Sequence, residues 1–178
     1  ISLNSIKNPN THNFSRGRRD AFKITTDVIQ NIIYLNKKYN ANKNINISSL
    51  IMPSNLDELI PLAEFTHNNG IGICFQLMDN GVSFYYENSN YNLGTEFNKI
   101  IYEKNEETIK TIDNLKALKE KGYLIYNSEN QLNDFKNIIL DTLNKIKSAS
   151  NTKYPETEKK EYPFFAKEGF NYSSAVTE

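Results

Sequence analysis

The feature that most constrains the fold is an alternation of short apolar segments with longer segments whose apolar residues recur at helical spacing. Residues 1–5, 45–52 and 71–78 predict strands, and residues 20–39 and 54–70 predict helices between them. Strands that alternate with helices in this way predict a parallel sheet with right-handed crossovers. The segment at 71–78 is nearly continuous in apolar residues, which is typical of a parallel strand covered on both faces.

The second half of the chain continues this pattern less regularly. Residues 106–121 predict a third helix, 123–126 a short strand, and 128–147 a fourth helix. The Tyr- and Asn-rich segment at 82–94 has no firm assignment, and a short strand at 82–86 stays open as an alternative. Beyond residue 148 the chain is polar and contains two prolines, which predicts an extended tail or linker.

Polar residues and glycines mark where the helices are expected to begin and end. The segment at 6–19 is rich in Asn, Pro, Ser and Gly, which predicts a loop. Ser54 and Ser128 are candidate N-caps, the pair Asp57-Glu58 suits a first helical turn, and Gly70 suits a helix stop. The residues expected to face the core are Phe22, Val28, Ile29, Ile32, Ile33 and Leu35 in the first helix and Leu132, Phe135, Ile138, Ile139, Leu143 and Ile146 in the last.

The composition excludes few classes of function. The chain has 178 residues, about one domain, with 21 basic and 21 acidic side chains, so no bulk charge predicts a nucleic-acid or membrane partner. No run is apolar enough to span a bilayer. The one cysteine, Cys74, cannot hold a zinc ion or an iron–sulfur cluster by itself, and we expect it to be inert. We expect a cytoplasmic protein, and a fragment, because the chain opens inside an apparent strand.

A candidate site follows the first strand. Ligands of parallel α/β proteins gather just past the carboxyl ends of strands. Ser2 and Asn4 lie at such an end and Arg16 lies in the next loop, which predicts a site for a polar, anionic small molecule. The alternative is that these polar residues only end a strand. His12 and His67 are too far apart to predict a metal pair, and a Tyr cluster at 85–91 predicts either a substrate mouth or a surface loop.

The order of these motifs resembles a known family. Ser2-Leu3-Asn4-Ser5, His12 and Arg16-Gly17 before a long helix are similar to the fourth strand and following loop of radical S-adenosylmethionine enzymes, in particular those with an auxiliary-cluster (SPASM-type) domain. The segments at 47–59 and 70–77 are similar to the fifth and sixth strands, and 112–128 to the helix and turn after the barrel. The resemblance covers about residues 1–143.

The resemblance implies a fold and residue roles. The fold would be α/β, the C-terminal half of a partial (β/α)6 TIM-like barrel at 1–127, followed by a helix at 128–147 and a tail at 148–178. Ser2 would contact the ribose of S-adenosylmethionine, Arg16 its carboxylate, and Leu77 its adenine, while Asn4 takes the place of an acid that contacts cofactor hydroxyls. The alternatives are that Ser2 ends a strand, Arg16 braces the loop on Asp20, and Leu77 is core.

The resemblance also implies what lies outside this chain. The full enzyme would cleave S-adenosylmethionine reductively at a [4Fe–4S] cluster, giving a 5′-deoxyadenosyl radical. The cysteine motif for that cluster and the glycine-rich stretch for the methionine amine are absent, so a missing N-terminal half of the barrel would supply them. Asn4-Ser5 also departs from the family's common Asp-Gly. We therefore expect this segment alone to be inactive. The alternatives are a non-catalytic half-barrel scaffold that needs a complementary chain, and an unrelated small α/β domain.

Overall fold

The computed structural model describes residues 1–41, 43–78 and 99–148, and it divides into units at 1–145 and 146–178, of which the first is described below. The predictions that fall on 79–98, including the strand at 82–86 and the Tyr cluster, lie outside the described residues, as does the tail from 149. The elements are α1 (Pro9–Arg16), α2 (Ala21–Tyr39), β1 (Asn46–Ile51), α3 (Leu56–Asn68), β2 (Gly72–Leu77), α5 (Asn105–Glu120) and α6 (Glu129–Ser148).

A short parallel sheet organises this unit. β1 and β2 pair in parallel, from Asn46 opposite Gly72 to Ile51 opposite Leu77. One parallel bridge on either side extends the sheet, Ser2 with Ser48 and Ile73 with Ile125. The predicted α/β class with parallel strands is therefore confirmed, although the strands expected at 1–5 and 123–126 are reduced to single bridges.

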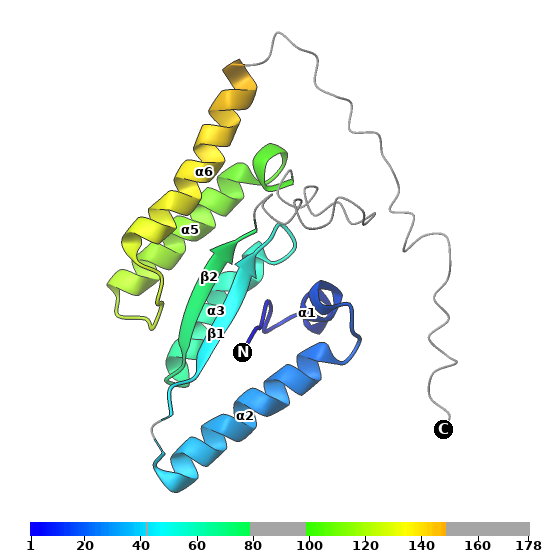
Figure 1. Cartoon of the computed structure of the whole chain (residues 1–178), viewed down its shortest axis with the longest axis vertical. Helices are drawn as coiled ribbons and strands as arrows, with labels where there is room; N and C mark the ends of the chain where they lie inside the picture. The colour runs from blue at the N-terminus through cyan, green and yellow to red at the C-terminus, as the bar shows by residue number, and fades with distance from the viewer. Residues whose placement is uncertain (42, 79–98, 149–178) are drawn as a thin grey trace, which may run out of the picture. The chain divides into compact units, whose positions relative to one another are not determined.

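The two faces of the sheet differ in burial. Side chains alternate between faces along a strand, and α3 packs on β1 and β2 and lies behind them in Figure 1. The residues on the α3 face are buried, namely Ile47, Ser49, Ile51, Ile73, Phe75 and Leu77. The opposite face, here called the open face, carries the less buried Asn46, Ser48, Leu50, Cys74 and Gln76.

The aromatic ring of Tyr126 lies over Gly72 on this open face. A Cβ atom at residue 72 would collide with ring atoms of Tyr126. The glycine therefore permits a close approach that no other residue allows. The Ile73 carbonyl also accepts a hydrogen bond from the Tyr126 N–H at 2.7 Å. Tyr126 therefore holds the segment around Ile125 against β2 both through its backbone and through its ring.

The segment predicted as a loop at 6–19 contains a helix instead. Asn8 caps α1, with its side chain accepting from the Asn10 N–H, Pro9 occupies the first turn, and Gly17 ends the helix with φ of 61°. The predicted cap at Ser54 is wrong by one residue, since Asn55 is the N-cap residue of α3. The predicted cap at Ser128 is confirmed, because Ser128 and Gln131 each accept the other's backbone N–H.

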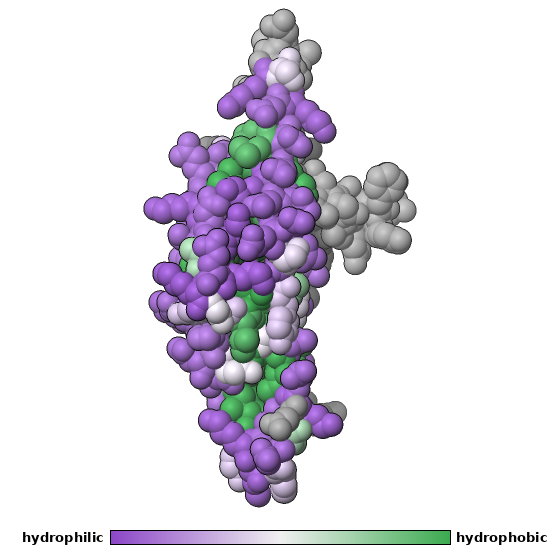
Figure 2. Space-filling view, turned by 90° about the vertical axis from the view of Figure 1, so that its left-hand side faces the viewer, coloured by the Kyte–Doolittle hydropathy of each residue, from purple (hydrophilic) through white to green (hydrophobic). Residues whose placement is uncertain are grey.

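The predicted core faces are confirmed only in part. Ile29 and Ile33 of α2 and Ile139 of α6 are buried, as expected. Val28 and Ile138 are each 43% exposed and Leu35 is 47% exposed, contrary to expectation. Figure 2 likewise shows apolar surface between hydrophilic side chains on one face of the molecule. Within the described ranges no helix is long and apolar enough to cross a bilayer.

Burial of α3 should dominate the stability of this unit. Leu59 is fully buried in the first turn of α3. Leu59→Ala should lower the free energy of unfolding by about 2–5 kcal/mol, because it removes buried methyl groups and leaves a cavity. Leu140→Ala, at an exposed position of α6, should change it by less than about 0.5 kcal/mol. Urea unfolding of both variants checks this, and equal losses would contradict it.

Candidate functional site

The candidate site lies at the carboxyl edge of the sheet, where Asn4 is almost wholly buried. Its side-chain amide donates to the hydroxyl of Ser15 at 2.9 Å, and its side-chain oxygen accepts from the Leu50 N–H at 3.1 Å. Its main-chain carbonyl accepts from the Asn55 side chain at 2.8 Å. Asn4 therefore braces this edge from within and does not face solvent.

Asn55 completes the brace from the start of α3. Its amide donates both to the Asn4 carbonyl and to the Leu50 carbonyl, each at 2.8 Å. Its side-chain oxygen accepts from the Met52 N–H at 2.9 Å. One buried side chain thus satisfies backbone groups of two neighbouring parallel segments beyond the point where their ladder ends.

Glu58 holds the chain that leaves this edge. It is 4% exposed, and one carboxylate oxygen accepts from the N–H groups of Ile6 and Lys7 at 2.9 and 2.8 Å. Two backbone donors directed at one oxygen are a strong, charge-assisted arrangement. The sequence indicates a first-turn acid here, whereas the structure makes Glu58 the anchor of the turn before α1.

His12 links Asn4 to Arg16. Its Nδ1 accepts from the Asn4 N–H at 3.2 Å, which leaves the ring proton on Nε2, 3.4 Å from the hydroxyl of Thr25. Burial, and second the charge of Arg16, lower the pKa of His12 to about 4 from an ordinary 6.5. The imidazole is therefore neutral at pH 7 and accepts a hydrogen bond that an imidazolium could not accept.

The other predicted site residues lie at separate places in this unit. Ser2 is half-buried on the open face, and its hydroxyl donates to the Ser48 carbonyl at 3.2 Å. Leu77 ends β2 with its side chain on the α3 face, about 10 Å further along the strands than Ser2. Arg16 is exposed at the end of α1 and acts on His12. Asp20, the alternative partner of Arg16, is paired with Arg18 instead.

His12 therefore accepts the Asn4 N–H and lies within the field of the Arg16 charge, whereas Ser2 and Leu77 lie on opposite faces of the sheet. Sequence reasoning missed Asn55 and Glu58. For Asn55, the only available signal was its place directly before a predicted helix, just after the strand that ends at Met52-Pro53. Nothing local distinguishes Glu58 from an ordinary first-turn acid, because its partners are about 50 residues away.

Comparison with protein-family models, with curated proteins and with solved structures found no match to this chain. In the part of the chain that the structure describes, no three His, Cys, Asp or Glu side chains gather where they could hold a metal ion. Cys74 is the only cysteine of the sequence, so these residues do not fit a [4Fe–4S] cluster.

The hydrogen bonds of Asn55 should contribute far more to the free energy of unfolding than the side chain of an exposed asparagine does. Asn55→Ala leaves the buried carbonyls of Asn4 and Leu50 and the Met52 N–H without this partner. The free energy of unfolding should fall by about 2–4 kcal/mol, since each unsatisfied buried group costs about 1–3 kcal/mol. Asn68→Ala, at an exposed position of the same helix, is the control and should be nearly neutral in chemical denaturation. Similar losses for both variants would rule out the brace.

His12 should make stability depend on pH. The pKa of His12 is about 4 when folded and near 6.5 when unfolded, so the unfolded chain binds more protons between these values. Its stabilising effect is complete above about pH 6.5 and is lost as the pH falls toward 4. The folding equilibrium constant should drop about tenfold or more between pH 7 and 5.

Unfolding measured at a series of pH values checks this, and His12→Gln should flatten the profile over that range. His67→Gln, which changes the only other histidine, should leave the slope in place. A slope that survives His12→Gln would assign the effect to another group.

Proposed function

We propose that this chain is the C-terminal half of a partial (β/α)6 barrel of the radical S-adenosylmethionine kind and contributes to binding the cofactor. The supporting observation is that four parallel segments follow one another across the sheet in chain order, at residue 2, β1, β2 and residue 125. Helices α2, α3 and α5 lie in the successive connections. This order gathers the polar groups that follow each segment at one edge, as in barrels of βα units.

Within this proposal the exposed guanidinium of Arg16 binds the carboxylate of S-adenosylmethionine through its forked donors. Ser2 presents its hydroxyl from the open face, where the ribose would replace the Ser48 carbonyl as its partner. Leu77 contributes main-chain groups at the end of β2 to the adenine. Asn4, being buried, positions helix α1, which carries Arg16, and does not contact the cofactor itself.

The proposal assigns no cluster chemistry to this chain. Reductive cleavage of the cofactor needs a [4Fe–4S] cluster, which the described residues cannot hold. What these residues can do is orient the cofactor and exclude water from one side of it, which is the protein's usual share in cofactor enzymes. The substrate of the complete enzyme lies outside this assignment.

Cofactor binding by the purified chain tests the proposal. S-adenosylmethionine should bind weakly, with Kd of about 1 mM, because only part of its surface is contacted. Arg16→Ala should weaken binding at least about tenfold, the loss expected for one charge-assisted contact. Arg19→Ala, a nearby exposed arginine, is the matched control. Ligand-observed NMR titration measures both, and a folded chain that shows no binding would contradict the proposal.

A second candidate is a non-catalytic half-barrel that serves as a scaffold for a complementary polypeptide. The exposed apolar side chains of α2, including Val28 and Leu35, favour it. A helix on the outside of a complete barrel normally buries such residues against its neighbours. In this case the chain would bind its partner but not S-adenosylmethionine.

A further inference from the structure

The two outer edges of the sheet differ in their free backbone groups. At the Ile125 edge the N–H donates to the Tyr123 carbonyl at 2.7 Å and the carbonyl accepts the Lys119 ammonium at 2.8 Å. At the Ser2 edge the neighbouring residues bond to β1, which turns the N–H and C=O of Ser2 outward, where neither has a partner among the residues described. One edge is thus closed by a lysine, as natural sheets close theirs, and the other can accept a strand.

Helix α2 lies on the same side of β1 as this edge (Figure 1), and it carries an exposed apolar stripe. Ile24, Val28 and Leu35 are separated by four and seven residues, which places them within one narrow line along the helix. They are 42%, 43% and 47% exposed, whereas Ile29 and Ile33 on the inner face are buried. The apolar surface of α2 is therefore wider than the part that the described residues cover.

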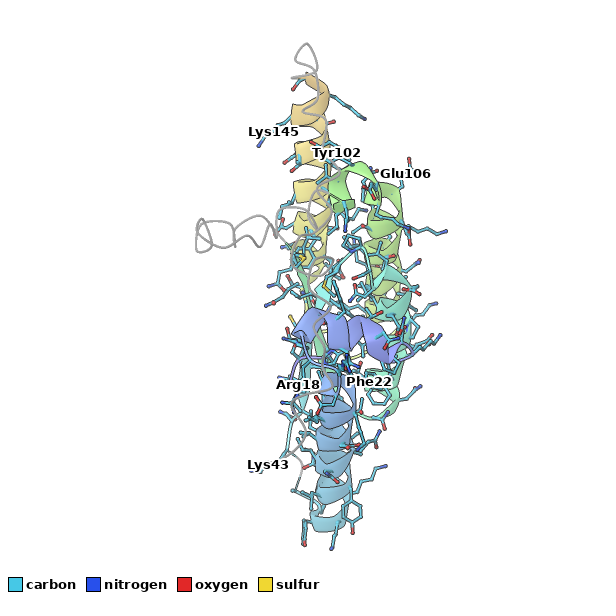
Figure 3. All side chains as sticks on the ribbon, turned by 90° about the vertical axis from the view of Figure 1, so that its right-hand side faces the viewer. Arg18, Phe22, Lys43, Tyr102, Glu106 and Lys145 are labelled. Atoms are coloured by element: carbon cyan, nitrogen blue, oxygen red, sulfur yellow. The ribbon has the colours of Figure 1, made fainter. Side chains whose placement is uncertain are left out.

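The same segment is strongly basic. Residues 1–43 contain eight Lys and Arg side chains and only two acids, although the whole chain is neutral. Both acids are already paired, Asp20 with Arg18 and Asp27 with Lys23. The cations gather at both ends of α2, and Figure 3 shows Arg18 near its start and Lys43 toward its other end. Negative charge on a partner that lies along α2 and reaches its ends would therefore strengthen binding.

We propose that the exposed stripe of α2 is the docking face for an acidic amphipathic helix of a partner polypeptide. Its apolar side chains would cover Ile24, Val28 and Leu35, and its acids would face the cations at the ends of α2. A strand joined to that helix could pair with Ser2 and continue the parallel sheet. This inference deepens the scaffold candidate and rests on it, and it does not require S-adenosylmethionine.

Other occupants fit the observations less well. A second copy of this chain seated through α2 would bring two basic segments together, which costs free energy. RNA would place phosphates against three aliphatic side chains, and the exposed rings of Tyr34 and Tyr39 on the same helix already lie under the ammonium of Lys38. An anionic membrane would match the charge, but it would supply no hydrogen-bond partners to the free backbone groups of the sheet edge on the same side of β1 as α2 (Figure 1).

Two synthetic helical peptides of about 20 residues test the proposal, one with Leu at the spacing of the stripe and Glu elsewhere, the other with Lys in place of Glu. The acidic peptide should bind the chain, measured by fluorescence anisotropy, and the basic one should not. Val28→Glu and Leu35→Glu should each weaken binding at least about tenfold. Lys38→Glu, three residues beyond Leu35 on the same side of the helix, should weaken binding of the acidic peptide and strengthen binding of the basic one.

Controls carry the same changes to other helices. Ile138→Glu, at an equally exposed apolar position of α6, and Lys110→Glu on α5 should leave binding unchanged. Circular dichroism establishes that each variant is folded, which is expected because every substituted side chain is exposed. The proposal would be overturned if the chain bound both peptides equally well. It would also be overturned if the Val28→Glu variant bound the acidic peptide as tightly as the unchanged chain does. Preferential binding to a 20-nucleotide RNA or to phosphatidylserine vesicles, or self-association that Leu35→Glu abolishes, would overturn it as well.

Loss of peptide binding and loss of S-adenosylmethionine binding are separate outcomes. Arg16→Ala should affect only the cofactor and Leu35→Glu only the peptide, because Arg16 lies on α1 and Leu35 lies near the far end of α2. Failure of one measurement therefore leaves the other result standing.

Discussion

The side-chain amides of Asn4 and Asn55 hold together the edge on which the rest of this unit depends. Between them they join the first segment, the end of β1 and the start of α3, which are separated by up to 51 residues. An amide suits this role because it carries both donors and an acceptor in one plane. Satisfied from all sides and buried, the pair fixes where the first segment stops pairing and where α1 begins.

Around this pair, apolar packing stabilises one side of the edge and buried hydrogen bonds stabilise the other. Beneath it, α3 and the inner face of the sheet exclude water through side chains such as Leu59 and Phe75. Above it, Glu58 and His12 supply acceptors to backbone N–H groups of the turn before α1. A neutral His12 fits here because an acceptor at Nδ1 is required beside the Arg16 charge. Arg16 is consequently carried at the end of a helix whose base is fixed, although its own side chain is exposed.

The alternation of strands and helices could be predicted from the sequence because periodicity reports local geometry. The helix α1 was missed since its Asn, Ser and Gly residues suggest turns, although Asn8-Pro9 and Gly17 are also typical of helix ends. Val28 was placed in the core because periodicity defines an apolar stripe but not which part of it a neighbour covers. At the site, Asn4 and Arg16 were identified, but the buried role of Asn4 depends on Asn55, whose distant contact no local pattern encodes.

The contact between Tyr126 and Gly72 has a consequence for the length of the chain that precedes it. The ring reaches the glycine only because Gly122 and Tyr123 turn the chain back from α5 within a few residues. Adding or deleting one residue in that turn would carry the ring to the opposite face, since neighbouring side chains of an extended segment alternate. Natural variants of this connection should therefore differ in residue type while keeping a constant number of residues.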